Sequence, residues 1–273
     1  MNDRSLVRQF QRIGAEARVG RMKGPREGRL YDVDLIDGGR QGDEVFNLSY
    51  ADAEEVEMQV IDVDRDDRHL LLLVKQLRNA SVEKHRYLCG HDERSWFVAA
   101  VPNQGRVAAT TVDGAKEALK PEEVVAAQHR LGGRRKNRHR RRNAAYLRQG
   151  EWFLIPSPNV EVDMRGVLRR EPLSRGRGKP HLAEEAFRTG GTTVYVSRQY
   201  PHGVPEETYR KLLKQDPRAR SADWRVMKRD PEVYCRGRLT HPDHATLRLR
   251  GWHRALPNTE SQAPWMVFLS FLD

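Results

Sequence analysis

The sequence predicts an α+β fold that consists mainly of antiparallel β hairpins with a few short helices. Pairs of apolar segments flank short charged turns, as in residues 56–63 and 70–74 around the turn at 64–68, and such pairs are typical of hairpins. Helical periodicity is confined to short segments. The chain contains no repeat period and no glycine-rich phosphate loop of the Walker or dinucleotide type, which argues against repeat folds and nucleotide-binding α/β folds.

The first half of the chain begins with a basic segment. Within residues 1–30, Leu6, Val7, Phe10 and Ile13 are spaced like one face of a short helix, so we expect a basic N-terminal arm or docking helix there. The elements expected after it are a strand at 31–36, hairpins at 56–74 and 87–101, and a helix at 115–131 whose better-formed part starts at Pro121.

The second half follows the sharpest change of composition in the chain. Its expected elements are strands at 151–155, 192–196, 233–239, 245–256 and 265–272, and short helices at 183–188 and 206–215. We therefore divide the chain into an N-terminal arm or docking helix (1–30), an N-terminal α+β part (31–133), a basic linker (134–143) and a C-terminal mainly β part (144–273).

Composition indicates a nucleic-acid partner and excludes several other classes. The chain has 49 Lys and Arg against 38 Asp and Glu, a formal net charge of +11. An arginine-rich surplus is typical of phosphate binding, although net charge alone also serves solubility. Two cysteines are too few for a disulfide framework. The longest apolar run, residues 70–74, is too short to span a membrane. We expect a cytoplasmic protein without a membrane partner.

The basic surplus is concentrated in two places. Residues 134–142 carry seven cations, and their mutual repulsion favours binding to a polyanion. A solvated linker is the alternative. Residues of a second group, within 165–179, could extend the same surface. The cations predicted to bind nucleic acid are Arg134, Arg135, Lys136, Arg138, Arg140, Arg141, Arg142, Arg175, Arg177 and Lys179.

A histidine-rich turn is the candidate for chemistry. His241 and His244 flank Asp243, and imidazoles beside a carboxylate suit general acid–base catalysis near neutral pH. We predict His244 as acid or base and Asp243 as the group that orients an imidazole. Strand alternation would place Arg248 on the same face as His244, where it would stabilise phosphoryl charge.

His181 is the remaining catalytic candidate. A helix at 183–188 would bring Glu184 or Glu185 onto one face with His181. The alternative is an ordinary helix start with acidic residues near its positive end.

Metal binding is a competing use of the same turn. Cys235, His241 and His244 could ligate zinc, although their spacing differs from that of zinc ribbons. The leading hypothesis is a nucleic-acid-binding protein, DNA or RNA, that acts as a histidine-dependent nuclease or phosphodiesterase. The alternative is a noncatalytic basic subunit of a larger protein or ribonucleoprotein assembly.

Overall fold

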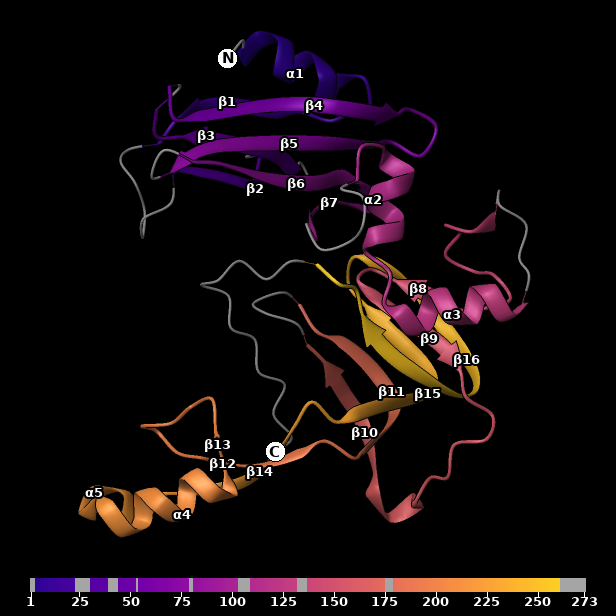
Figure 1. The fold of residues 1–273 in the computed structure, drawn as a ribbon. Coiled ribbons are helices and arrows are strands. Elements are labelled where there is room, and N and C mark those ends of the chain that lie inside the picture. Colours follow the sequence, from indigo (N-terminus) through magenta and orange to yellow (C-terminus); the bar gives the residue numbers. More distant parts are fainter. Residues whose placement is uncertain are drawn as a thin grey trace. The chain divides into compact units, whose positions relative to one another are not determined.

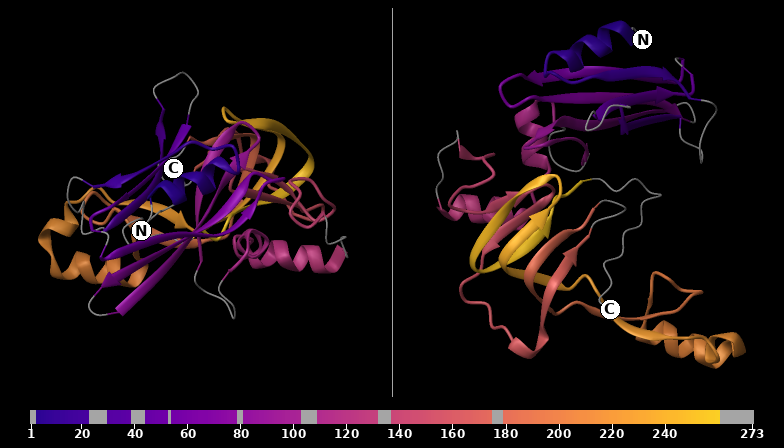
Figure 2. Two further views of the ribbon diagram at one scale, coloured as in Figure 1. Left: turned by 90° about the horizontal axis from the view of Figure 1, so that it is seen from above. Right: turned by 180° about the vertical axis from the view of Figure 1, so that it is seen from behind.

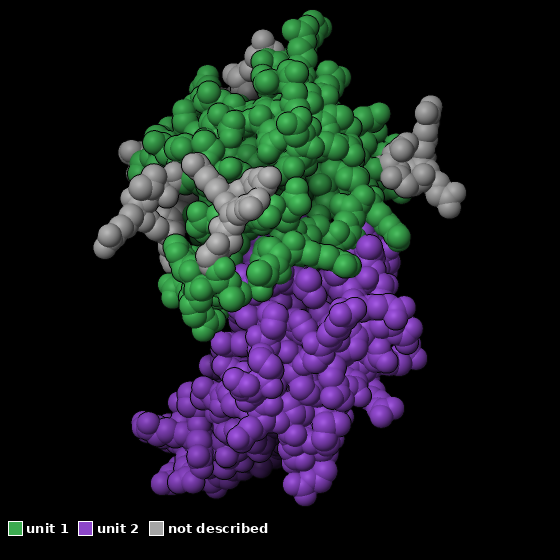
Figure 3. All heavy atoms as spheres, turned by 90° about the vertical axis from the view of Figure 1, so that its right-hand side faces the viewer, with its two compact units in different colours: residues 1–144, 258–262 green, residues 145–257, 263–273 purple. Residues whose placement is uncertain are grey.

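A computed structural model shows the α+β fold, rich in antiparallel hairpins, that the sequence predicts (Figure 1). The chain forms two compact units, coloured separately in Figure 3: unit 1 comprises residues 1–144 and 258–262, and unit 2 comprises residues 145–257 and 263–273. Among the described residues, no helix is long and apolar enough to cross a membrane. The described residues are 3–22, 30–38, 44–52, 54–78, 81–102, 109–131, 137–174 and 179–260.

Unit 1 contains two sheets and three helices among its described residues. The three-stranded sheet has the order β1-β3-β2, in which β1 pairs with β3 in parallel, and the four-stranded sheet has the order β4-β5-β6-β7. The elements are α1 (Asp3–Gln11), β1 (Ala17–Arg21), β2 (Tyr31–Asp37), β3 (Glu44–Tyr50), β4 (Val56–Asp64), β5 (His69–Arg78), β6 (Ser81–Asp92), β7 (Ser95–Val101), α2 (Val112–Ala118) and α3 (Glu122–Leu131).

Helix α1 docks on the core of unit 1. Its buried residues Leu6 and Phe10 pack with Phe46 of β3, and the ring centroids of Phe10 and Phe46 are 4.9 Å apart. Strand β5 faces cores on both sides, because Leu70 and Leu72 contact this cluster while Leu71 packs with the buried side of α2. This two-sided burial explains why residues 70–74 form an unbroken apolar run.

Unit 2 is built on a six-stranded sheet with the order β10-β11-β15-β16-β9-β8. Apolar side chains of this sheet form a separate core that includes Leu154, Leu239 and Leu247. The elements of this sheet are β8 (Leu147–Gln149), β9 (Trp152–Pro156), β10 (Val167–Leu173), β11 (His181–Thr189), β15 (Glu232–His241) and β16 (His244–Pro257), with a 3-10 turn, η2 (Met164–Gly166), before β10.

Strand β11 replaces the helix that the sequence predicts at residues 183–188. It pairs with β10 on one side and β15 on the other, and this pairing buries Ala183, Ala186 and Phe187. Burial against neighbouring strands outweighs the local helical preference. Glu184 and Glu185 therefore do not share a helical face with His181, which stands at the first position of the strand.

Strand β16 is bent, and the bend positions the candidate site. Its pairing with β15 shifts register between Cys235 and Gly237, and Gly251 has a φ of +82° in the corresponding part of β16. The second half of β16 pairs with β9, yet the side chain of Gln149 reaches the carbonyl oxygen of Ala245 at its first half. The turn between β8 and β9 thus meets the beginning of β16.

The β11–β15 ladder continues into a smaller three-stranded sheet of order β13-β12-β14 (Figure 2). Helix α4 packs on this sheet, where the rings of Tyr195 and Tyr209 stack 3.9 Å apart, and Trp224 contacts Tyr209 edge-on. We call residues 192–229 the finger. Its elements are β12 (Thr192–Val196), β13 (Val204–Pro205), α4 (Glu206–Gln215), α5 (Pro217–Arg220) and β14 (Arg225–Arg229).

The docking of α1 gives the first testable prediction. Replacing the fully buried Phe10 with alanine removes its contact with Phe46 and leaves a cavity, which costs about 3 to 5 kcal/mol of the free energy of unfolding. The exposed Arg4 on the same helix is the control, and Arg4→Ala should change stability by less than about 0.5 kcal/mol. Urea unfolding followed by circular dichroism measures both; equal midpoints for the two variants would contradict the packing of α1.

Candidate histidine site

Three histidines from three neighbouring strands come together in unit 2. His181 begins β11, His241 ends β15, and His244 begins β16. The ring centroids of His181 and His241 are 4.2 Å apart, those of His241 and His244 are 4.7 Å apart, and those of His181 and His244 are 5.5 Å apart. One ligand atom from each of the three lies within 4.8 Å of the others. The histidine-rich turn around Asp243 therefore meets a third histidine that is distant in sequence.

A β-bulge controls which face of the sheet His244 occupies. Leu239 pairs with Leu247 and His241 pairs with His244, so β16 holds one more residue than β15 between these two pairs. Cross-strand partners lie on one face of a sheet, which places His244 with His241 and with the buried Leu247. Arg248 adjoins Leu247 and is exposed on the opposite face. Arg248 therefore does not lie beside His244, because the bulge interrupts the alternation assumed in the sequence analysis.

Gln149 orients the ring of His181. The buried amide group of Gln149 donates hydrogen bonds to the carbonyl oxygens of Leu239 (3.2 Å) and Ala245 (2.7 Å). These carbonyls flank the bulge, where a strand ladder is interrupted. Because both amide hydrogens are used, the Gln149 oxygen is the group that lies 3.0 Å from His181 Nδ1 and accepts its hydrogen bond. His181 thus carries a proton on Nδ1.

Glu151 faces the other nitrogen of His181. Its Oε2 lies 3.3 Å from His181 Nε2. Burial acts to raise the pKa of the Glu151 carboxyl, but the hydrogen bond and charge of His181, helped by the nearby His244, hold this pKa below its ordinary value. Glu151 is therefore an ionised carboxylate at neutral pH, directed at an imidazole nitrogen.

Gly150 lies between these two residues at the β8–β9 turn. Its φ of +56° is in the left-handed region that favours glycine. A Cβ at this position would lie 2.8 Å from His244 Nε2 and 3.3 Å from His181 Nε2. Both Nε2 atoms therefore border the space beside Gly150.

His241 is held by hydrogen bonds at both of its nitrogens. The backbone N–H of Asp243 donates to Nδ1 (3.1 Å), so Nε2 carries the proton that faces the carbonyl oxygen of Lys179 at 3.2 Å. Burial and the neighbouring His181 lower the pKa of His241, consistent with a neutral ring. Asp243 orients this imidazole through its backbone, while its carboxylate accepts a hydrogen bond from Lys179 Nζ (2.9 Å).

Cys235, the remaining zinc-ligand candidate, and His253 lie elsewhere. Cys235 is fully buried in the core of unit 2, and burial raises the pKa of its thiol to about 12. A cysteine binds a metal ion as the thiolate, and the histidine cluster contains no cysteine. His253 is buried on β16, 3.0 Å from the carbonyl oxygen of Gly251.

The predicted basic segments are only partly described. Arg138 forms an ion pair with Glu117 (2.6 Å), and Arg141 pairs with Glu93. These two arginines are used within unit 1, whereas Arg140 and Arg142 are exposed. Lys179 is exposed beside Asp243. The remaining cations lie outside the described residues; they are Arg134, Arg135, Lys136, Arg175 and Arg177.

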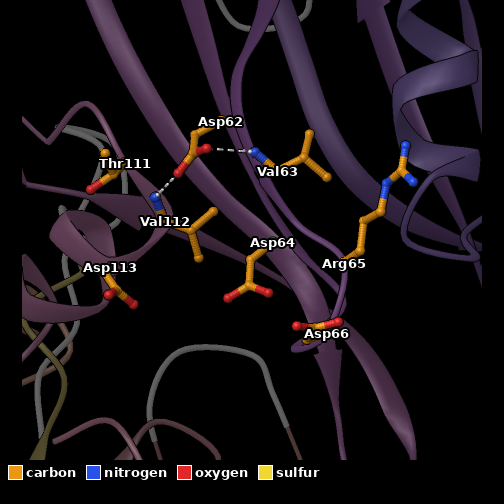
Figure 4. A pocket seen from close by; sticks show the side chains of 8 residues that line it. All are labelled: Asp62, Val63, Asp64, Arg65, Asp66, Thr111, Val112 and Asp113. Carbon is orange, nitrogen blue, oxygen red and sulfur yellow. Dashed lines mark hydrogen bonds between the residues drawn. The ribbon is translucent and has the colours of Figure 1, made fainter. Parts of the chain in front are cut away.

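An acidic pocket on unit 1 serves a structural role (Figure 4). The carboxylate of Asp62 accepts hydrogen bonds from the backbone N–H groups of Val63 (2.9 Å) and Val112 (2.7 Å). Asp64 lies 3.7 Å from Lys116 Nζ. These contacts join β4 to helix α2 and its preceding residues, so we assign no chemistry to the pocket.

Sequence reasoning did not find Gln149, Gly150 and Glu151 as site residues. Gln149 ends β8, and Gly150 and Glu151 form the short turn that leads to β9. A polar turn of this kind normally indicates solvent exposure. The short length of this turn is the one sequence feature that could have indicated the site, because a tight turn before the strand at 152–156 keeps residues 149–151 close together. Comparisons with known proteins add no further candidate, since the chain matches no known protein family, no curated protein and no solved structure.

The close approach of Gly150 to the histidines is testable by a matched pair of substitutions. Gly150→Ala should displace His181 and His244, because the new methyl group would lie 2.8 Å from His244 Nε2. Gly190 also has a positive φ, +69°, but a Cβ there would meet nothing within 4 Å. Both variants should lose about 1 kcal/mol to backbone strain, but only Gly150→Ala should shift the imidazole resonances in NMR spectra. Unchanged histidine resonances in Gly150→Ala would refute the placement of this turn.

Proposed function

We propose that unit 2 hydrolyses phosphodiester bonds of nucleic acid at a site formed by Glu151, His181 and His244. The observation that carries this proposal is the convergence of two imidazole nitrogens on the space beside Gly150, with a carboxylate 3.3 Å from one of them. Convergent titratable groups from separate strands are typical of catalytic sites.

The charge arrangement at this site suits an anionic substrate. The Nδ1 proton of His181 is committed to Gln149, so its Nε2 and the Glu151 carboxylate can hold a cation between them. A cation held there presents positive charge to a phosphoryl group, and this stabilises the charge that develops during hydrolysis. The exposed ammonium group of Lys179 also lies near the three histidines, where it pairs with the Asp243 carboxylate beside His241.

The finger supports nucleic acid as the polyanion. Its helix–strand segment combines aromatic rings with many Lys and Arg side chains, and such combinations are typical of surfaces that bind nucleic-acid backbones. Exposed cations of the finger include Arg198, Lys211, Lys214, Arg218, Arg225 and Lys228.

The cleavage proposal is tested with labelled single-stranded RNA and DNA oligonucleotides. Glu151→Gln and His244→Ala should each reduce the cleavage rate at least about 100-fold, because each removes a group that faces the reacting bond. Arg248→Ala is the matched control, since Arg248 is on the same strand but on the opposite face of the sheet, and its rate should equal that of the unmodified protein.

Two results would count against cleavage at this site. Equal rates for all four proteins would indicate a contaminating nuclease. Binding of both oligonucleotides without any cleavage would favour the alternative, a noncatalytic basic subunit of a larger assembly.

The described part of the basic segment makes a separate prediction about binding. Replacing the exposed Arg140 and Arg142 with alanine should weaken binding to an oligonucleotide and reduce the slope of log affinity against log salt by about 2. Arg138→Ala should instead lower stability, because it breaks the ion pair with Glu117. Fluorescence anisotropy at several salt concentrations measures the slope; an unchanged slope in the double variant would exclude these arginines from the interface.

A further inference from the structure

We infer that the histidine site of unit 2 binds one divalent transition-metal ion of the zinc type, with His181 Nε2, His244 Nε2 and Glu151 as its protein ligands. The inference concerns the same site as the proposed function and names a cofactor for it. It rests on four features of the described residues: the proton on His181 Nδ1, the separation of the ligand atoms, the space beside Gly150, and the hydrogen bonds of His241.

The first feature is the fixed tautomer of His181. Gln149 donates both amide hydrogens to the carbonyl oxygens of Leu239 and Ala245, so its own oxygen must accept the hydrogen bond from His181 Nδ1. His181 Nε2 then directs a lone pair toward the carboxylate of Glu151 unless a cation stands between them. A carbonyl group that holds the second nitrogen of a histidine is also the usual outer contact of a metal-binding imidazole.

The second feature is the arrangement of ligand atoms. Ligands at 2.0 to 2.2 Å from a tetrahedral ion lie about 3.3 to 3.6 Å apart, and His181 Nε2 is 3.3 Å from Glu151 Oε2. A ligand atom of His244 lies within 4.8 Å of one of His181, in a group of three histidines that does not include Glu151. A proton can bridge only two ligand atoms, whereas one metal ion can bind both imidazole nitrogens and the carboxylate.

The third feature is the space that both Nε2 atoms face. The absent side chain of Gly150 leaves a position 2.8 Å from His244 Nε2 and 3.3 Å from His181 Nε2. A methyl group would fill this position, and the left-handed φ of Gly150 disfavours one. The glycine therefore keeps open the place where the two nitrogens converge.

The fourth feature limits the protein ligands to three. His241 accepts from the Asp243 N–H and faces the Lys179 carbonyl, so ligation by His241 would break one of these contacts. Three protein ligands, two imidazoles and one carboxylate, leave a coordination position for water or substrate. Such open sites are typical of catalytic zinc, in which the ion lowers the pKa of bound water and polarises the phosphoryl group.

The test uses the full chain stripped of metal with a chelator. Titration with Zn²⁺ should reveal one tight site, and Co²⁺ at the same site should give the visible absorption bands of a four-coordinate ion. Glu151→Gln and His244→Ala should weaken Zn²⁺ binding at least about 100-fold, and Gln149→Leu should weaken it about 10- to 100-fold because it releases His181. His202→Ala, at an exposed histidine of the finger, is the control and should bind as tightly as the unmodified protein.

His241→Asn tests the ligand set, because its amide oxygen can still accept from the Asp243 N–H. This variant should retain the Zn²⁺ site. Loss of the site in His241→Asn together with its retention in Glu151→Gln would overturn the assignment, as would unchanged affinity in both Glu151→Gln and His244→Ala. Glu151→Gln is nearly isosteric, so its result stands even if His244→Ala does not fold.

The metal inference and the proposed function can fail separately. Failure of Zn²⁺ to bind the metal-free protein, together with oligonucleotide cleavage that persists in it, would overturn the metal site and leave the phosphodiesterase proposal intact. Tight, Glu151-dependent Zn²⁺ binding without cleavage of either oligonucleotide would support the metal site and remove the proposed activity.

Discussion

The candidate site depends on the side-chain amide of Gln149. This one group donates to two carbonyls beside the β15–β16 bulge and accepts from His181 Nδ1. An unpaired buried carbonyl costs about 1 to 3 kcal/mol, so the bulge and the glutamine stabilise each other. Because the amide has no freedom to turn over, the ring of His181 is held with Nε2 toward Glu151.

The remaining contacts of the site form around this orientation. Gly150 and Glu151 follow Gln149 directly. The same short segment therefore places the Gln149 amide, the space beside Gly150 and the Glu151 carboxylate next to the histidines. The bulge that Gln149 satisfies also moves His244 onto the same face as His241. The bulge interrupts regular strand pairing, but it helps to bring side chains from β8, β11, β15 and β16 together. Bulges commonly occur beside active sites.

The sequence predicts the hairpins of this protein and singles out the three histidines of the site, but it does not predict the residues that orient them. The 240–243 turn is visible because polar turn residues separate apolar strands. The bulge opposite Leu239 has no comparable signature, since it is an offset in pairing between two strands, and the expected position of Arg248 was wrong for that reason. The helix expected at 183–188 is a strand because its neighbours in the sheet bury Ala183 and Ala186. Similarly, the ion pair between Arg138 and Glu117 joins residues that no local pattern connects.

The protonation of His181 tests the account most directly. Long-range ¹H–¹⁵N correlation spectra of the metal-free protein distinguish which imidazole nitrogens carry protons. The contacts of Gln149 predict a proton on His181 Nδ1 in the unmodified protein. In Gln149→Leu this preference should be lost, so that the proton exchanges between the two ring nitrogens. A neutral His181 with its proton on Nε2 would contradict the orientation of the amide and, with it, the arrangement of the whole site.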